Sequence, residues 1–263
     1  MKVMKKYLIT LCLAFPAVLF TAQAQQDRTP SLIRSYLNGW EYSIHAGFNV
    51  GGTSPLPLPK EIRSLDKYKP GLGISIEGTA TKWFDERKKW GMSIGLRLDN
   101  RSMETKATTK NYGMEIQNAD GGTLKGLWTG GVQTKVKNSY LTLPVLANHR
   151  INSRWMVSAG PYVSYLTDGS FSGYVYEGHL RTPDQGGSRV NFEGTNMATY
   201  DFSDDLRNFQ WGVQAGAEWK AFKHLVVHAN LNWGLNDIFR KDFETIDFSM
   251  YPIYLNVGFG YAF

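Results

Sequence analysis

Alternating apolar and polar residues run through eight segments of the chain. In residues 40–50, apolar side chains occupy the even positions and polar or small side chains the odd positions. A period of two indicates a β-strand, because successive side chains of a strand point to opposite faces. The pattern recurs in residues 72–80, 90–98, 140–150, 155–166, 209–219, 225–233 and 251–263. Each segment has about the 9 to 11 residues that a tilted transmembrane strand needs.

The lengths of the connections favour one β architecture over another. Short turns are expected at 85–88, 152–153 and 221–223, whereas long connections are expected at 51–69, 100–138, 167–208 and 236–249. A soluble β-sandwich can also alternate, but short turns at one end and long loops at the other are typical of outer-membrane barrels. The sequence therefore predicts an all-β domain over residues 39–263, an eight-stranded antiparallel transmembrane β-barrel with short periplasmic turns and long extracellular loops. An even number of strands returns both termini to the periplasm.

Aromatic residues gather at the two ends of the predicted strands. This sorting is expected at the two membrane–water interfaces and not in a soluble β core. The set at the turn or terminus end is Trp40, Trp83, Trp90, Trp155, Trp219 and Phe263, and the set nearer the loops is Phe48, Trp211, Trp233 and Tyr251. We expect these residues to form two aromatic girdles.

The N-terminus has the features of an export signal. Three lysines precede the apolar run 7–20, which is followed by the small-x-small cleavage pattern Ala22-Gln23-Ala24. The run is too short for a permanent membrane helix. We therefore predict a signal peptide at 1–24, a short periplasmic segment at 25–38, and a mature protein in the bacterial outer membrane.

Charge and cysteine content exclude several function classes. The chain has 29 Lys and Arg against 23 Asp and Glu. Without the signal lysines the excess is only about three, too small for a nucleic-acid-binding surface. The only cysteine, Cys12, lies in the predicted signal, which excludes disulfides and metal–thiolate sites from the exported chain.

Polar residues on the inner face of the strands predict the contents of the lumen. An eight-stranded barrel is just wide enough for its side chains to fill, so we expect a hydrogen-bonded plug in which Glu77 and Arg97 pair. The alternative is a narrow conduit or proton-linked gate that uses His45 and His228 as titrating groups. The predicted lumen residues are Glu41, His45, Glu77, Arg97, Arg150, Gln210, Gln214, Glu218, His228 and Asn230.

The sequence predicts no catalytic residue, metal or cofactor. His179 lies near Asp184 and Ser188 in the third long connection, but that connection has no Gly-x-Ser-x-Gly motif. His224 and His228 are four residues apart, which separates them by ~13 Å on a strand. A lipid-modifying enzyme is therefore only the third candidate function.

The long connections are the places where a specific function is expected. Residues 100–138 have more basic than acidic side chains, which fits either contact with lipopolysaccharide phosphates or an ordinary solvated loop. Ten strands remain an alternative if part of 114–136 forms a membrane hairpin. The aromatic residues of 167–208 fit either strands that project above the membrane or a recognition surface.

These features predict a non-enzymatic outer-membrane protein that acts in surface interaction or envelope integrity, with a narrow porin for small solutes as the alternative. The expected partners are outer-membrane lipid and lipopolysaccharide, and the barrel-assembly machinery during insertion. We expect a monomer that binds no nucleic acid.

Several short runs resemble the PorT-like outer-membrane β-barrel family of small porin-like proteins. They are residues 208–212 (Asn-Phe-Gln-Trp-Gly), 232–236, 140–144 and the ending Gly260-Tyr261-Ala262-Phe263. The resemblance implies an outer-membrane barrel with diverse roles, one member being linked to protein secretion. This chain has Thr142, Asn148, Gln210 and Asn230 where the family usually carries charge, so the resemblance does not extend to that charged network.

Overall fold

The computed structural model describes residues 39–117, 122–184, 186–192, 194, 197–246 and 248–263. The predicted signal peptide and the segment 25–38 lie outside the described residues. The chain divides into two units, Met1–Trp40 and Glu41–Phe263, and the elements below belong to the second, with β1 starting at the boundary. No helix in the described residues is long and apolar enough to cross a membrane.

Strands make up nearly all of the regular structure. They are β1 (Trp40–Pro55), β2 (Ile62–Pro70), β3 (Gly73–Trp83), β4 (Trp90–Gln117), β5 (Thr123–Arg150), β6 (Trp155–Thr182), β7 (Ser188–Phe192), β8 (Ala198–Asp201), β9 (Phe209–Lys220), β10 (Leu225–Gly234) and β11 (Met250–Ala262), with one 3-10 turn, η1 (Ser203–Asp205). The predicted all-β, antiparallel fold is confirmed. The expected number of strands was too low, since the sheet contains eleven.

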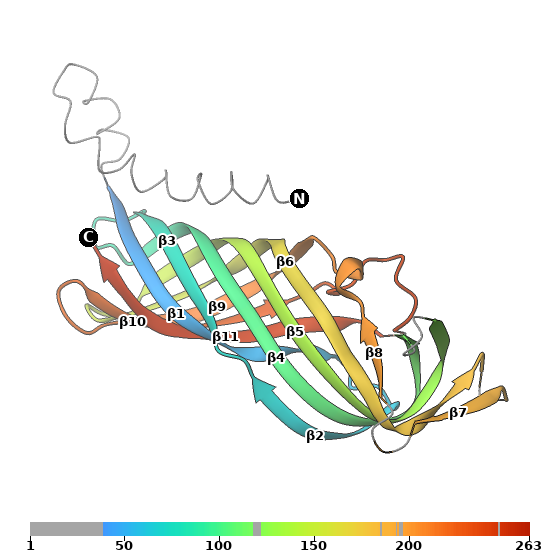
Figure 1. The fold of residues 1–263 in the computed structure, drawn as a ribbon. Helices are drawn as coiled ribbons and strands as arrows, with labels where there is room; N and C mark the ends of the chain where they lie inside the picture. The colour runs from blue at the N-terminus through green and yellow to red at the C-terminus, as the bar shows by residue number, and fades with distance from the viewer. Residues whose placement is uncertain (1–38, 118–121, 185, 193, 195–196, 247) are drawn as a thin grey trace, which may run out of the picture. The chain divides into compact units, whose positions relative to one another are not determined.

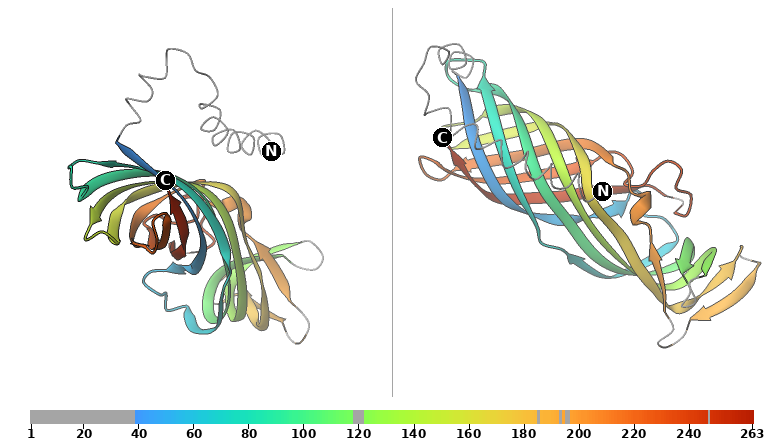
Figure 2. Two further views of the ribbon diagram at one scale, coloured as in Figure 1. Left: turned by 90° about the vertical axis from the view of Figure 1, so that its left-hand side faces the viewer. Right: turned by 45° about the horizontal axis from the view of Figure 1, so that its top comes forward.

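Eight of these strands pair in a closed cycle. The order is β1–β3–β4–β5–β6–β9–β10–β11, and β11 pairs with β1 again. Each of the eight segments predicted from alternation falls mainly in one strand of this ring, and Figure 1 and Figure 2 show the strands curving round to meet. The other three, β2, β7 and β8, attach to the far ends of β4 and β6.

The ring is apolar outside and polar inside. Along β4, Ile94, Leu96 and Leu98 are 46, 40 and 43 % exposed, whereas the alternating residues Ser93 and Arg97 are 5 and 1 % exposed. A soluble protein buries its apolar face instead, because burial removes that face from water. The inverted pattern is that of strands whose outer face meets lipid.

Strands β4, β5 and β6 continue far beyond the ring. Each has 28 residues, and in Figure 1 they run on toward β2, β7 and β8. The extension has a hydrophobic core in which Ile116, Trp128 and Val175 are 0 % exposed. We call this part, β2, β7, β8 and the ends of β4, β5 and β6, the external sheet.

The prediction of a long loop at 100–138 was wrong, because most of this segment belongs to the external sheet. Pairing continues from Met103 opposite Val136 to Gln117 opposite Thr123, so most of this segment is strand. Its apolar residues pack against Phe202, Phe239 and other residues distant in sequence, which the local pattern did not show. The segment 167–208 also contains strands, as one of the two interpretations of its aromatic residues predicts.

Short turns close the opposite end of the ring. Asp85, between β3 and β4, accepts hydrogen bonds from the backbone N–H groups of Trp90 and Lys89, both at 2.9 Å. These bonds, that of Trp90 first, lower the pKa of the Asp85 carboxyl. Asn152 accepts from the N–H groups of Arg154 and Trp155 in the next turn.

Candidate functional site

A chain of buried ion pairs crosses the interior of the ring. Arg97 donates from Nε to Asp99 (2.8 Å) and from Nη1 to Glu77 (3.1 Å). It also donates to Gln214 (3.0 Å) and to Asn232 (2.8 Å). A guanidinium has five N–H donors. The four hydrogen bonds therefore satisfy most of the donors of Arg97, which is 1 % exposed.

The ion-pair chain continues outward from Asp99. Arg101 donates from Nε to Asp99 at 3.0 Å, and its guanidinium lies 4.9 Å from the ring centroid of Tyr140. The rings of Tyr254 and Tyr162 lie 5.6 and 5.8 Å from the same group, so three aromatic rings surround the cation. Glu77, Arg97, Asp99 and Arg101 therefore fill this part of the lumen with paired charges, and we call these four residues the plug.

Sequence reasoning missed Asp99 and Arg101. Both continue the inward alternation of Arg97 along β4, and both are buried, at 3 and 2 % exposed. The prediction ended that strand at Leu98, where the apolar outer residues stop. The signal that could have found them is the alternation itself, followed past the edge of the apolar band.

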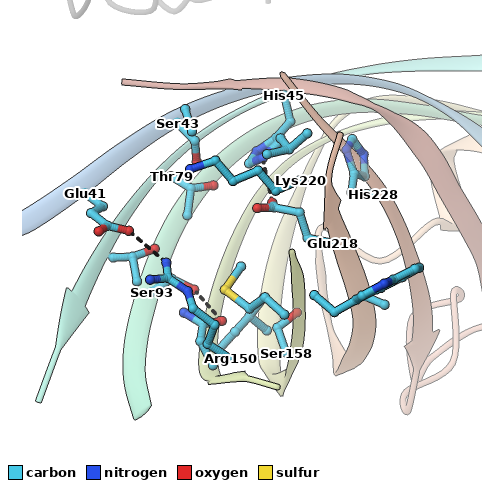
Figure 3. Close-up of a pocket in the computed structure, with 18 of the residues that line it drawn as sticks. Glu41, Ser43, His45, Thr79, Ser93, Arg150, Ser158, Glu218, Lys220 and His228 are labelled. Atoms are coloured by element: carbon cyan, nitrogen blue, oxygen red, sulfur yellow. Dashed lines mark hydrogen bonds and ion pairs between the residues drawn. The ribbon is translucent and has the colours of Figure 1, made fainter. Parts of the chain in front are cut away.

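A polar cavity of about 490 Å³ lies at the turn end of the ring (Figure 3). Glu41 sits at its mouth, where it accepts from Lys88 at 2.7 Å and from Arg150 at 3.2 Å. The Arg150 guanidinium lies 4.2 Å from the ring centroid of Trp83. Of the ten predicted lumen residues, all but Arg97 and Gln210 line this cavity.

Two histidines point into the cavity beside a carboxylate (Figure 3). His45 Nε2 is 3.2 Å from a carboxylate oxygen of Glu218, and its ring meets that of His228 edge-on at 5.1 Å. His228 Nε2 lies 2.9 Å from Oδ1 of Asn256, whose Nδ2 donates to Asn49 and Ser75. Nε2 is therefore the donor, and Nδ1 of His228 has no hydrogen-bond partner among the described residues.

The remaining predicted lumen residues lie at different depths. Gln214 accepts from Arg97 beneath the cavity, and Asn230 is half-buried in the cavity wall. Gln210 is 0 % exposed and donates from Nε2 to the backbone carbonyl of Asp237 at 3.1 Å. Gln210 therefore links the interior to the connection between β10 and β11.

Most predicted girdle residues lie on the outer face, but Trp83 does not. The exposed ones are Phe48, Trp90, Trp155, Trp211, Trp219, Trp233 and Phe263, while Trp40 and Tyr251 are half-buried. Trp83 is 9 % exposed and lines the cavity. Its place in the girdle was wrong because it shares the inward alternation of Glu77 and Thr81 along β3.

Among the described residues, no carboxylate is bonded to His179, the histidine considered for catalysis. His179 pairs with Asn191 across β6 and β7, and burial together with the charges of Arg189 and Arg181 lowers its pKa. A general base of a catalytic triad needs a carboxylate or similar partner instead. Within the described ranges, no group of three His, Cys, Asp or Glu side chains is placed to hold a metal ion.

Comparison with known proteins identifies the family. A family model described as "Outer membrane protein beta-barrel domain" matches residues 23–240. The chain belongs to the outer membrane protein beta-barrel domain family. Membership places this family member in the bacterial outer membrane. No curated protein matches the chain.

Solved structures similar to this family member are outer-membrane proteins of different kinds. Ail, the attachment invasion locus protein of Yersinia pestis, has 12 % identity over 85 % of this chain and 97 % of its own, with a TM-score of 0.38. OprG from Pseudomonas aeruginosa has 14 % identity over 85 and 95 %, with a TM-score of 0.32. The outer membrane protease OmpT from Escherichia coli has 12 % identity over 91 and 99 %, with a TM-score of 0.32. Similarity at this level distinguishes no activity.

The ion pairs at the cavity mouth are expected to contribute little to stability. Glu41 is 38 % exposed, so water screens its attraction to Lys88 and Arg150. Glu41→Gln should lower the free energy of unfolding by less than about 1 kcal/mol. Urea unfolding of the refolded protein in vesicles measures the change, and a larger loss would show that the mouth is coupled to the buried plug.

Proposed function

We propose that this protein is an eight-stranded transmembrane barrel that acts without catalysis, in surface interaction or envelope integrity, through its external sheet. The observation that carries the proposal is the hydrophobic core beyond the polar interior of the ring, in which Ile116, Trp128 and Val175 are 0 % exposed. A loop that merely connects two strands does not need a core of its own. A rigid scaffold that presents strands and loops is a common basis for binding.

The proposed orientation follows from the asymmetry of the two ends. The short turns lie in the periplasm and the external sheet lies outside the cell, so both termini are periplasmic. Within the family, the short motifs at 140–144 and 208–212 support a PorT-like assignment. We expect a monomer that the barrel-assembly machinery inserts.

A second candidate function is the passage of small solutes. The cavity of about 490 Å³ at the turn end favours this idea, because it is polar and wide enough to hold water. The plug closes it from the other side, with Arg97 1 % exposed. Passage therefore requires these buried pairs to separate, which makes a conduit the weaker candidate. A lipid-modifying enzyme is weaker still, since arginines flank His179.

A shortened variant tests the proposed function. Ser102 and Lys137 lie directly opposite each other on β4 and β5, so a two-residue turn can replace residues 103–136 without changing the register. In cells that lack the native protein, the variant should assemble as a heat-modifiable barrel but leave the cells as sensitive to detergent and large antibiotics as the deletion strain. Full restoration of resistance by the shortened variant would contradict the proposal.

Conductance separates the second candidate from the first. Pure wild-type protein in planar bilayers should give no steady openings. Steady openings that change in Glu77→Gln would instead identify a conduit through the plug.

A further inference from the structure

Two buried polar atoms face the cavity at the turn end of the ring, which we call the turn-end cavity, without a hydrogen-bond partner among the described residues. They are Nδ2 of Asn148 and Nδ1 of His228, whose residues line the cavity and are 1 and 5 % exposed. A polar atom that is buried without a partner destabilises the fold, because it has lost its hydrogen bonds to water. Each atom therefore needs a partner that enters the cavity.

The two atoms offer opposite halves of a hydrogen bond. Nε2 of His228 donates to Asn256, so Nδ1 is the acceptor nitrogen of a neutral imidazole. Oδ1 of Asn148 accepts from Ser93 at 3.5 Å, and the free Nδ2 is a donor. A partner that satisfies both atoms must accept one hydrogen bond and donate another, as hydroxyl groups do.

The register places both residues on one polar wall of the cavity. The wall spans β5, β6, β9 and β10, which are adjacent in the ring. One row of inward residues on these strands is Asn148, Ser158, Gly216 and Asn230. The next row, two residues nearer the turns, is Arg150, Met156, Glu218 and His228. Rows two residues apart are separated by about 7 Å, so one small molecule can contact both.

The acidic side chains that line the cavity already have partners. They are Glu41 with Lys88 and Arg150, Glu77 with Arg97, and Glu218 with His45. The lining cations without a carboxylate partner among the described residues are Arg154, Lys220 and Lys223, which are all exposed at the turn end. The buried part of the cavity therefore favours an uncharged ligand over an ion.

Hydroxyl side chains supply much of the remaining polar lining (Figure 3). They include Ser43, Thr79, Thr81, Ser93 and Ser158. Hydroxyls donate and accept hydrogen bonds, so this lining matches a ligand that itself carries several hydroxyls. The volume of about 490 Å³ lies within the range of about 300 to 1,000 Å³ that is typical of small-molecule sites.

We propose that the turn-end cavity binds a neutral sugar, with one sugar hydroxyl accepting from Nδ2 of Asn148 and another donating to Nδ1 of His228. Arg97 and Glu77 of the plug close the inner end, so the sugar enters and leaves at the turn end. The site lies at the opposite end of the ring from the external sheet, and the inference goes beyond the proposed function. In the proposed orientation, the cavity opens to the periplasm.

Titration of the refolded mature protein in zwitterionic micelles, which carry no sugar headgroup, tests the proposal. The probes are glucose, N-acetylglucosamine and maltose, with glucuronate as the charged counterpart of glucose. Calorimetry should show saturable binding of at least one neutral sugar, and glucuronate should bind more weakly than that sugar. Absence of saturable binding by all three neutral sugars, or binding of glucuronate that is as tight or tighter, would overturn the proposal.

Two variants remove the proposed partners one at a time. Asn148→Ala and His228→Phe should each weaken binding of the best neutral sugar about tenfold, because each removes one hydrogen bond from a buried site. The matched control is His149→Phe, because His149 follows Asn148 on β5 but lies beside the outward Trp90, with ring centroids 4.1 Å apart. Unchanged affinity in both cavity variants, or an equal loss in His149→Phe, would overturn the proposal.

A filled cavity provides a variant that keeps both hydrogen-bonding side chains. Ser158 lies beside Asn148 in the same inward row, so Ser158→Phe places an aromatic ring in the space of the cavity. The variant should keep its heat-modifiable migration and lose saturable sugar binding. Wild-type affinity in Ser158→Phe would mean that the sugar binds elsewhere and would overturn the proposal.

Liposome swelling distinguishes a closed binding site from a path for solutes. Wild-type protein should bind the sugar without letting it into liposomes, because the plug closes the inner end of the cavity. Swelling that depends on the bound sugar would overturn the closed site and would favour solute passage instead.

Discussion

Arg97→Met is expected to lower the free energy of unfolding by about 3 to 5 kcal/mol, because it leaves buried carboxylates without their partner. Arg97 is the only cation bonded to Glu77 among the described residues, and Glu77 is 7 % exposed. Asp99 keeps its bonds from Arg101 and is therefore affected less. Urea unfolding in vesicles, followed by tryptophan fluorescence, measures the loss.

Two further variants make this result specific. Glu77→Gln combined with Arg97→Met removes both charges and should recover part of the lost stability, so the pair should show a clear coupling energy. Arg154→Met, at an exposed turn position, should change stability by no more than about 0.5 kcal/mol. If Arg97→Met unfolds at the wild-type urea concentration, the plug does not hold the lumen together.

The same variants address the role of the plug in passage. Arg97 lies between the cavity and the tyrosines around Arg101. Its four hydrogen bonds therefore determine whether a continuous path for solutes runs through the ring. Methionine fills a similar volume without the bonds. If Arg97→Met lowers the free energy of unfolding but gives no conductance, the buried charges serve the fold. This outcome agrees with an external site of action.

The alternation of side chains was enough to predict the ring strands and the inward direction of their polar residues. It worked because lipid outside and a polar lumen inside impose opposite demands on neighbouring residues, as at Leu96, Arg97 and Leu98. Trp83 shows the risk of using residue type in place of alternation. An aromatic residue at a strand end suggested the girdle, although its position in β3 is an inward one.

The external sheet could not be predicted in the same way. Beyond Leu98 the outer positions of β4 become polar, so the contrast between the two faces weakens while the strand continues. The core there depends on contacts between residues far apart in sequence, such as Trp128 with Phe192 and Phe171 with Phe239. Which residues face each other across β2, β4, β5 and β6 there also depends on register, which a single sequence does not reveal.

Trp128→Ala is expected to destabilise the external sheet while the ring stays assembled. Trp128 is 0 % exposed, and its ring meets that of Phe192 edge-to-face at 5.4 Å. Truncation of a buried tryptophan leaves a cavity that costs about 3 to 5 kcal/mol. The ring has its own buried network and its own pairing, so the loss should appear as local opening of the external sheet. Hydrogen exchange should therefore speed up for amides in 103–117 and 123–136 and stay slow in β9, β10 and β11.

Trp90→Ala is the matched control, because Trp90 is 56 % exposed at the opposite end of β4. It should leave exchange in the external sheet unchanged. Heat-modifiable migration should persist in both variants, since the pairing that closes the cycle, from β9 through β10 and β11 to β1, does not involve Trp128. Parallel loss of protection in β9, β10 and β11 would mean that the sheet and the ring unfold as one unit. If exchange instead stays slow in the ring while the external sheet opens, the surface can be altered while the barrel stays in the membrane. A scaffold for surface interaction requires this independence.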